Sequence, residues 1–110
     1  MSWFAFTKRG NINEMVAQAK GIKASMLVDV RTVEEYEQGH IPGSVNVPLD
    51  SLEDISGRAK QDSPLYVYCH SGARSARATA QLRRMGYINV NDMGGIMSWN
   101  GAIARGGNVQ

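Results

Sequence analysis

Short apolar runs alternate along the chain with segments in which apolar residues recur every three or four positions. Runs over residues 26–30, 44–47 and 65–68 are typical of β-strands, and residues 3–6 and 87–90 give two shorter candidates. The run at 65–68 has no polar group apart from its tyrosine hydroxyls, which favours a strand covered on both faces. The pattern therefore predicts five short strands, one of them deeply buried.

Helical spacing fills the intervals between these runs. It predicts helices near residues 11–20, 32–38, 51–59, 75–85 and 96–100. The first two begin with capping-box sequences at residues 11–14 and 32–35, and the second is expected to turn Val33 and Tyr36 to the same side. The pair Gly94-Gly95 predicts a tight turn ahead of the last helix.

The order of these elements predicts the architecture. Strands that alternate with helices through short connections pair in parallel, because a helix is the usual crossover between parallel strands. The sequence therefore predicts an α/β fold of three layers, in a single domain over residues 1–110. In such folds a ligand site lies beyond the carboxyl ends of the strands. Functional residues are expected where the 65–68 strand ends.

The composition narrows the class of protein. Hydrophobic residues make up 43% of the chain and charged residues 20%, as in soluble globular proteins, and a net charge of +2 does not suggest nucleic-acid binding. One cysteine excludes an internal disulfide framework, and His40 and His70 add too few ligands for structural zinc. The N-terminus lacks the charge order of a signal peptide, and no run approaches the roughly 20 apolar residues that span a bilayer. We expect a cytoplasmic protein.

The single cysteine, Cys69, stands where the 65–68 strand gives way to a helix. Gly72 permits a positive φ, so that consecutive N–H groups can turn inward as an anion-binding nest, and Ser75 is expected to cap the helix. The helix dipole and Arg74 add positive potential, and all these features favour the thiolate over the thiol. The alternative is that Cys69 is a small hydrophobic residue at the end of a buried strand. The glycine, arginine and serine that follow it favour a nucleophile.

The segment from Cys69 to Ser75, Cys-His-Ser-Gly-Ala-Arg-Ser, resembles the active-site loop of the single-domain rhodaneses, sulfurtransferases that carry sulfur as a cysteine persulfide. The family's other landmarks stand in the expected order: Asp29-Val30-Arg31, Glu34 to Ser44 with its Gly-His-Ile-Pro-Gly, Asn46, Pro48, and Gly94 to Trp99. Together these motifs run from about residue 25 to residue 101. The resemblance implies a three-layer rhodanese fold with a five-stranded, mainly parallel sheet flanked by helices on both faces.

The resemblance also implies a ping-pong sulfur transfer, with no metal and no organic cofactor. Cys69 would be the catalytic residue, and the loop would bind the substrate through His70, Ser71, Gly72, Ala73, Arg74 and Ser75. A small anionic donor such as thiosulfate would give sulfur to the thiolate, and cyanide, an external thiol or an acceptor protein would remove it. Because Cys69 is the only cysteine of the sequence, the acceptor thiol is expected to belong to another molecule.

Two other functions fit parts of the same pattern. Cysteine-dependent phosphatases and arsenate reductases share the chemistry, but their loop resembles a cysteine followed by five residues and then arginine, whereas four residues separate Cys69 from Arg74. The shorter loop favours a terminal sulfur over a phosphate. The second alternative is a binding or redox-sensing module without turnover. The intact set of Cys69, Gly72 and Arg74 argues for chemistry.

Several residues outside the loop have open roles. His70 is expected either to tune the thiolate or to face solvent, and His40 is expected to hold a loop by hydrogen bonds. Asp29 and Arg31 are expected to belong to the scaffold, although Arg31 could add positive charge to the pocket. On the 75–85 helix, the apolar stripe of Ala78, Leu82 and Met85 is expected to face the core. The opposite face could dock an acidic acceptor protein through Arg77, Arg83 and Arg84.

Overall fold

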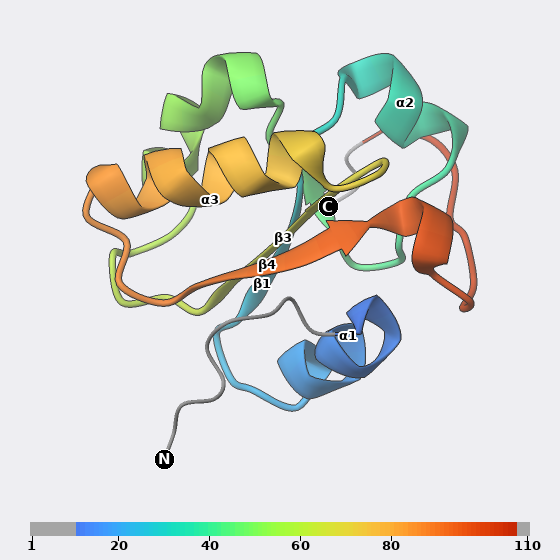
Figure 1. Ribbon diagram of the computed structural model, residues 1–110, viewed down its shortest axis with the longest axis horizontal. Coiled ribbons are helices and arrows are strands. Elements are labelled where there is room, and N and C mark those ends of the chain that lie inside the picture. The colour runs from blue at the N-terminus through green and yellow to red at the C-terminus, as the bar shows by residue number, and fades with distance from the viewer. Residues whose placement is uncertain (1–10, 108–110) are drawn as a thin grey trace.

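The computed structural model describes residues 11–107, and a parallel sheet lies at its centre (Figure 1). Its strands are β1 (Met26–Asp29), β2 (Val45–Asn46), β3 (Leu65–Cys69) and β4 (Val90–Gly95). They pair in the order β2-β1-β3-β4, and every pair is parallel. Five strands were expected. The described residues contain four, because the candidate strand at residues 3–6 lies outside them.

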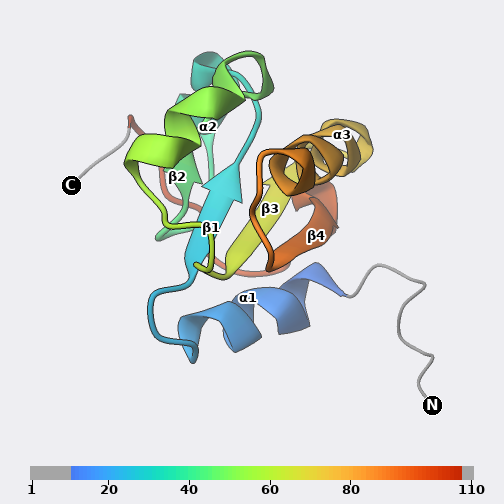
Figure 2. The same cartoon turned by 90° about the vertical axis from the view of Figure 1, so that its left-hand side faces the viewer.

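Helices cover both faces of the sheet, which confirms the three-layer α/β architecture (Figure 2). Helix α1 (Ile12–Lys20) packs on one face, while the 3-10 segment η1 (Leu49–Gly57) and helix α3 (Ala73–Arg84) pack on the other. Helix α2 (Val33–Gln38) follows β1, and a short 3-10 turn, η2 (Ile96–Ser98), follows β4. Among the described residues, every helix is too short or too polar to cross a membrane.

The alternation of side chains along the strands divides the core into two layers. On β3, Leu65, Val67 and Cys69 face the layer under η1 and α3, whereas Tyr66 and Tyr68 face the layer over α1. All five residues of β3 are buried, as its composition predicted. Cys69 thus points its side chain to the α3 side of the sheet, at the carboxyl end of a central strand.

Caps fix the starts of the first two helices, and the two apolar residues of the second helix differ in burial. The Asn11 side chain accepts hydrogen bonds from the first turn of α1, and Thr32 and Glu35 form the predicted capping box at the start of α2. Tyr36 of α2 is buried, but Val33 is 48% exposed. Of these two residues, only Tyr36 packs into the core, because Val33 stands at the first position of the helix.

The last strand and the helix after Cys69 do not have their predicted limits. Strand β4 begins at Val90 and runs through Gly94 and Gly95, which were expected to form a turn. Gly94 has a φ of 87°, and the pairing with β3 shifts register there, so the glycine marks a bulge inside the strand. Helix α3 starts two residues earlier than predicted, at Ala73. The predicted helices at 51–59 and 96–100 are 3-10 turns over Leu49–Gly57 and Ile96–Ser98.

Candidate active site around Cys69

The sulfur of Cys69 lies under the loop that connects β3 to α3. Its Sγ accepts hydrogen bonds from the backbone N–H groups of Gly72, at 3.0 Å, and of Ser75, at 3.3 Å. Cys69 is 1% exposed and belongs to the hydrophobic layer under α3. Burial alone would suit a structural cysteine as well as a nucleophile. The two converging N–H groups distinguish this cysteine from an ordinary core residue, because they offer hydrogen bonds that stabilise a thiolate.

The path of the loop explains why these N–H groups point at the sulfur. Gly72 has a φ of 115°, a left-handed conformation that a residue with a side chain rarely adopts, and it is the N-cap of α3. Ser75, which was expected to be the cap, instead lies within the first turn. Its Oγ lies 3.0 Å from the Gly72 carbonyl oxygen and 2.7 Å from Oδ1 of Asp92 on β4. The serine therefore ties the start of α3 to the sheet, while its N–H faces the sulfur.

Strand β4 supports the loop from the other side, and this support was missed at the sequence level. A Cβ on Gly95 would lie 2.6 Å from Ser71 Cα and closer still to the His70 carbonyl oxygen, both of them backbone atoms. The N–H of Met97 donates to that same carbonyl, at 3.2 Å. Gly95 thus allows the loop backbone to lie directly on β4. The signal was the Gly94-Gly95 pair, which was interpreted as a turn.

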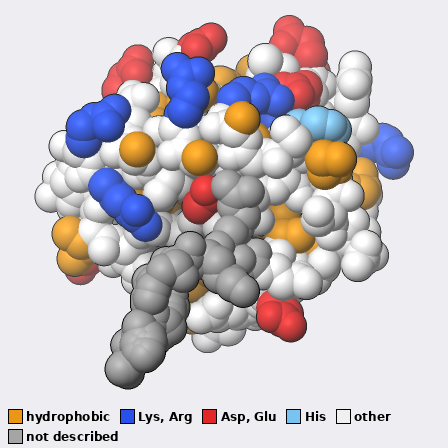
Figure 3. Space-filling view, in the orientation of Figure 1, with side chains coloured by type: hydrophobic (Ala, Val, Ile, Leu, Met, Phe, Trp, Pro, Cys, Tyr) orange, Lys and Arg blue, Asp and Glu red, His pale blue; other side chains and the backbone are white. Residues whose placement is uncertain are grey.

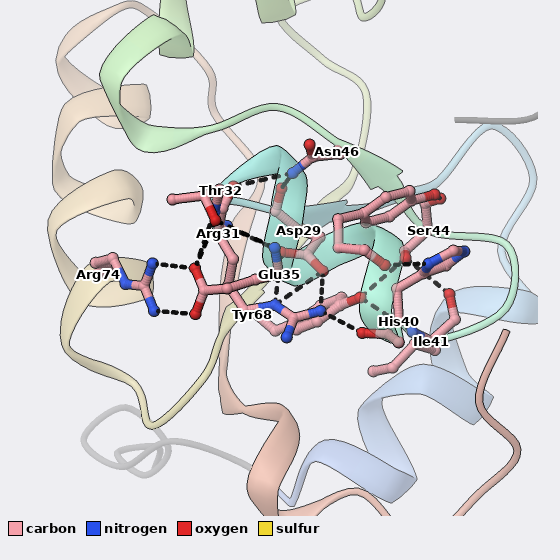
Figure 4. A network of polar contacts seen from close by, with 12 residues as sticks. Asp29, Arg31, Thr32, Glu35, His40, Ile41, Ser44, Asn46, Tyr68 and Arg74 are labelled. Atoms are coloured by element: carbon pink, nitrogen blue, oxygen red, sulfur yellow. Dashed lines mark hydrogen bonds and ion pairs between the residues drawn. The ribbon is translucent and has the colours of Figure 1, made fainter. Parts of the chain in front are cut away.

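Arg74 reaches across to α2 and pairs with Glu35 (Figure 4). Its Nη1 and Nη2 donate to the two carboxylate oxygens of Glu35, at 2.7 and 3.0 Å. The guanidinium lowers the pKa of Glu35 to about 2, and Glu35 in turn raises the pKa of Arg74. The interaction with Cys69 adds to the rise in the pKa of Arg74, so the guanidinium lies within electrostatic reach of the sulfur. The sequence indicated Glu35 as a capping residue, but not as the partner of Arg74.

Asp29 and Arg31 form a buried ion pair at the end of β1, next to β3. The Arg31 guanidinium donates to both oxygens of Asp29, at distances from 2.7 to 3.1 Å, and to the Gly39 carbonyl. The Asn46 side chain donates to the carbonyls of Asp29 and Arg31, at 3.0 Å each. Asp29 is 0% exposed and Arg31 5%. This arrangement matches the expected scaffold role, and Arg31 directs its charge at Asp29.

A second set of buried hydrogen bonds joins Tyr68 to the loop before β2. The Tyr68 hydroxyl accepts from the Ile41 N–H and lies 2.9 Å from Ser44 Oγ. His40 stacks on Tyr36, with ring centroids 3.7 Å apart, and its Nδ1 lies 2.8 Å from the Tyr36 carbonyl oxygen. Its backbone also bridges to Ala104. His40 holds this loop, in the way the sequence suggested.

The remaining loop residues lie at the surface. His70, Ser71 and Ala73 are exposed, and Ser71 borders a groove of about 310 Å³ between the start of α1 and the end of β4.

The apolar stripe of α3 is buried at Ala78 and Leu82. The opposite face of α3 exposes basic residues. Figure 3 shows Lys and Arg side chains gathered on the side of the molecule where α3 lies. These exposed arginines are Arg77, Arg83 and Arg84. Docking of an acidic protein to them stays a prediction.

The sequence of this chain matches a family of known proteins. The sequence model described as the rhodanese-like domain matches residues 12–102. Thiosulfate sulfurtransferase GlpE of Shewanella oneidensis is 32% identical over 98 residues, which cover 88% of this chain and 96% of that protein. The uncharacterized protein YqhL of Bacillus subtilis is 38% identical over 84 residues, which cover 76% of this chain and 67% of that protein.

A longer relative and a solved structure agree with these matches. The putative sulfur carrier protein YrkF of Bacillus subtilis is 38% identical over 76 residues, which cover 68% of this chain and 41% of that protein. The solved structure described as a rhodanese with anions from E. coli superimposes with a TM-score of 0.68 at 30% identity. The superposition covers 76% of this chain and 100% of that one.

Proposed function

Because the chain belongs to the rhodanese-like domain family, we propose that it is a sulfurtransferase that carries sulfane sulfur on Cys69. The observation that carries the proposal is the pair of backbone N–H groups, from Gly72 and Ser75, that converge on Cys69 Sγ at the first turn of α3. The relatives named thiosulfate sulfurtransferase and putative sulfur carrier support the same reaction class.

In the first half-reaction, the Cys69 thiolate attacks the outer sulfur of a donor such as thiosulfate. The sulfur–sulfur bond of thiosulfate breaks, sulfite leaves with the electron pair, and a persulfide remains on Cys69. The attack needs no general base, because the nucleophile is already an anion. Backbone N–H groups at a helix start stabilise the negative charge on sulfur before and after the transfer, and the loop supplies these groups in a fixed arrangement.

In the second half-reaction, an acceptor attacks the outer sulfur of the persulfide. Cyanide would leave as thiocyanate and a thiolate as its own persulfide, while the Cys69 thiolate departs with the electron pair of the broken bond. The 110 residues contain one cysteine, so the acceptor thiol lies outside them. The exposed arginines Arg77, Arg83 and Arg84 of α3 are our candidate docking surface for an acidic acceptor protein.

Turnover with thiosulfate and cyanide tests the proposal. The wild-type protein is expected to form thiocyanate, and Cys69→Ser is expected to abolish it while the far-UV circular dichroism spectrum stays unchanged. The intact mass of the wild type should rise by one sulfur atom after thiosulfate treatment and return after cyanide. If the mass never changes with any of several donors, sulfur transfer is excluded and a binding or redox-sensing module is favoured.

A parallel assay separates the other cysteine chemistry. The same preparations are tested with an aryl phosphate and with arsenate in the presence of thiols. The loop of four residues between Cys69 and Arg74 is expected to give no phosphate release above the Cys69→Ser background. Phosphate release that depends on Cys69, without persulfide formation, would contradict the proposal and assign the protein to the phosphatase class.

A further inference from the structure

Arg74 is the one Lys or Arg side chain of the Cys69–Ser75 loop, yet its positive charge is already paired within the protein. Both of its terminal nitrogens bind the carboxylate of Glu35 in a bidentate ion pair, at 2.7 and 3.0 Å (Figure 4). Bidentate pairs of this kind have fixed geometry and are stronger than single contacts. An anion that reaches Cys69 therefore meets a guanidinium whose charge is paired with Glu35 and two of whose five N–H donors are already used.

The position of Glu35 is itself held by α2. Its Oε1 accepts from the Thr32 backbone N–H, at 3.0 Å, and from the Thr32 hydroxyl, at 3.2 Å, in the capping box. Arg74 and Glu35 side chains are each 34% exposed, so the pair lies at the rim of the site rather than in the core. Glu35 is thus held beside the loop by contacts within α2 as well as by Arg74.

These contacts lead to an inference that rests on the sulfur transfer proposed above. We propose that Glu35 is a positioning residue that sets the charge preference of the Cys69 site: by holding Arg74, it biases the site away from doubly charged donors. The favoured donors carry one negative charge or none, as a thiol persulfide does. In that case the Cys69 thiolate attacks the outer sulfur, the sulfur–sulfur bond breaks, and the donor thiolate leaves with the electron pair.

Glu35→Gln tests this role, because glutamine keeps one oxygen for the capping box while it removes the charge and one of the two acceptors for Arg74. The test compares the rates at which iodoacetate, an anion, and iodoacetamide, its neutral counterpart, alkylate Cys69. The ratio of the iodoacetate rate to the iodoacetamide rate is expected to rise about threefold in the variant, as one unit of charge at a hydrated rim would give. The matched control is Glu34→Gln, an exposed neighbour on the same helix, which is expected to leave the ratio unchanged.

Steady-state kinetics test whether the charge of Glu35 affects the choice of sulfur donor. Glu35→Gln is expected to lower the KM for thiosulfate, which carries two charges, about threefold more than the KM for an arenethiosulfonate, which carries one. The alkylation ratio can be measured whether or not the protein transfers sulfur. The experiment therefore distinguishes a failure of the proposed sulfur transfer from a failure of the proposed role of Glu35. Without turnover, a threefold rise in the ratio would still support the role of Glu35 in the charge of the site.

A double variant controls for a folding defect in Glu35→Gln. Glu35→Gln combined with Arg74→Gln removes both charges, and its alkylation ratio is expected to match the wild type. A ratio that falls in the double variant would show that Arg74 dominates the site and would overturn the proposal. Equal changes of both alkylation rates in Glu35→Gln, or no alkylation of Cys69 by either reagent, would also overturn it.

Discussion

Two neighbouring strands end at the same edge of the sheet, and their ends are built in different ways. At the end of β1, Asp29 is enclosed by side chains: Arg31 closes back onto its carboxylate, and the Asn46 amide binds its backbone carbonyl. At the end of β3, Cys69 receives only backbone N–H groups, from Gly72 and Ser75. The end of β1 holds a buried ion pair with its hydrogen bonds satisfied, and the end of β3 holds a thiol that is bound by backbone N–H groups.

The difference explains why one end is scaffold and the other a candidate site. A side-chain partner of opposite charge neutralises the group it binds and fills the space beside it. Backbone N–H groups stabilise negative charge without neutralising it by a counter-ion, and they keep their position because the loop fixes them. Arg74, the one Lys or Arg of the loop, is held by Glu35. The protein thus keeps Arg74 in an ion pair at the rim and the reactive sulfur under the backbone.

The largest expected effect comes from breaking the β1 end. Asp29→Asn leaves the buried Arg31 guanidinium without a counter-ion, and the loss of one partner of a buried ion pair costs about 3–5 kcal/mol. The free energy of unfolding, measured by urea denaturation, is expected to fall by that amount. Asp54→Asn, an exposed acid on η1, is the control and is expected to change the stability by less than about 0.5 kcal/mol.

The contrast with the other strand end sharpens this prediction. Cys69→Ser keeps an acceptor for the two N–H groups, so its expected loss of stability is only about 1 kcal/mol although activity disappears. The double variant Asp29→Asn with Arg31→Met removes the stranded charge and is expected to recover much of the lost stability. If Asp29→Asn loses less than about 1 kcal/mol, the buried ion pair at the end of β1 does not stabilise the fold as described above.

The next effect concerns the support of the loop by β4. In Gly95→Ala, the added methyl group meets the backbone of His70 and Ser71, so the loop must move off the strand. A displacement of about 1 Å at a reacting group lowers turnover roughly 100-fold, and that loss is expected in thiocyanate formation. Gly57→Ala is the matched control, because a Cβ there has no neighbour within 4 Å. Equal activity of the two variants would show that the contact with β4 does not position Cys69.

The sequence predicted the local features of the site but missed the contacts between distant residues, for physical reasons. Local signals identified the Cys69 loop, the capping box of Thr32 and Glu35, and the buried strand β3, because each depends on residues close together in the chain. The pairing of Glu35 with Arg74 joins residues 39 positions apart, and no local pattern encodes it. Gly95 was assigned to a turn because a glycine pair at a bulge and a glycine pair in a turn look alike without the partner strand.

The smallest expected effect separates the two ion pairs by their response to acid. Arg74 lowers the pKa of Glu35 from 4.5 to about 2 in the folded protein, so the contribution of this pair to stability is fully present above about pH 4.5 and is lost as the pH falls through 2. At a rim that is one-third exposed, solvent screening limits the contribution to about 0.5 kcal/mol. The difference in unfolding free energy between wild type and Glu35→Gln, measured at pH 6, 3.5 and 2, is therefore expected to shrink by that amount at the lowest pH. A difference that stays constant over this range would mean that the ionisation of Glu35 contributes nothing to stability, since glutamine preserves the cap and has no charge to lose.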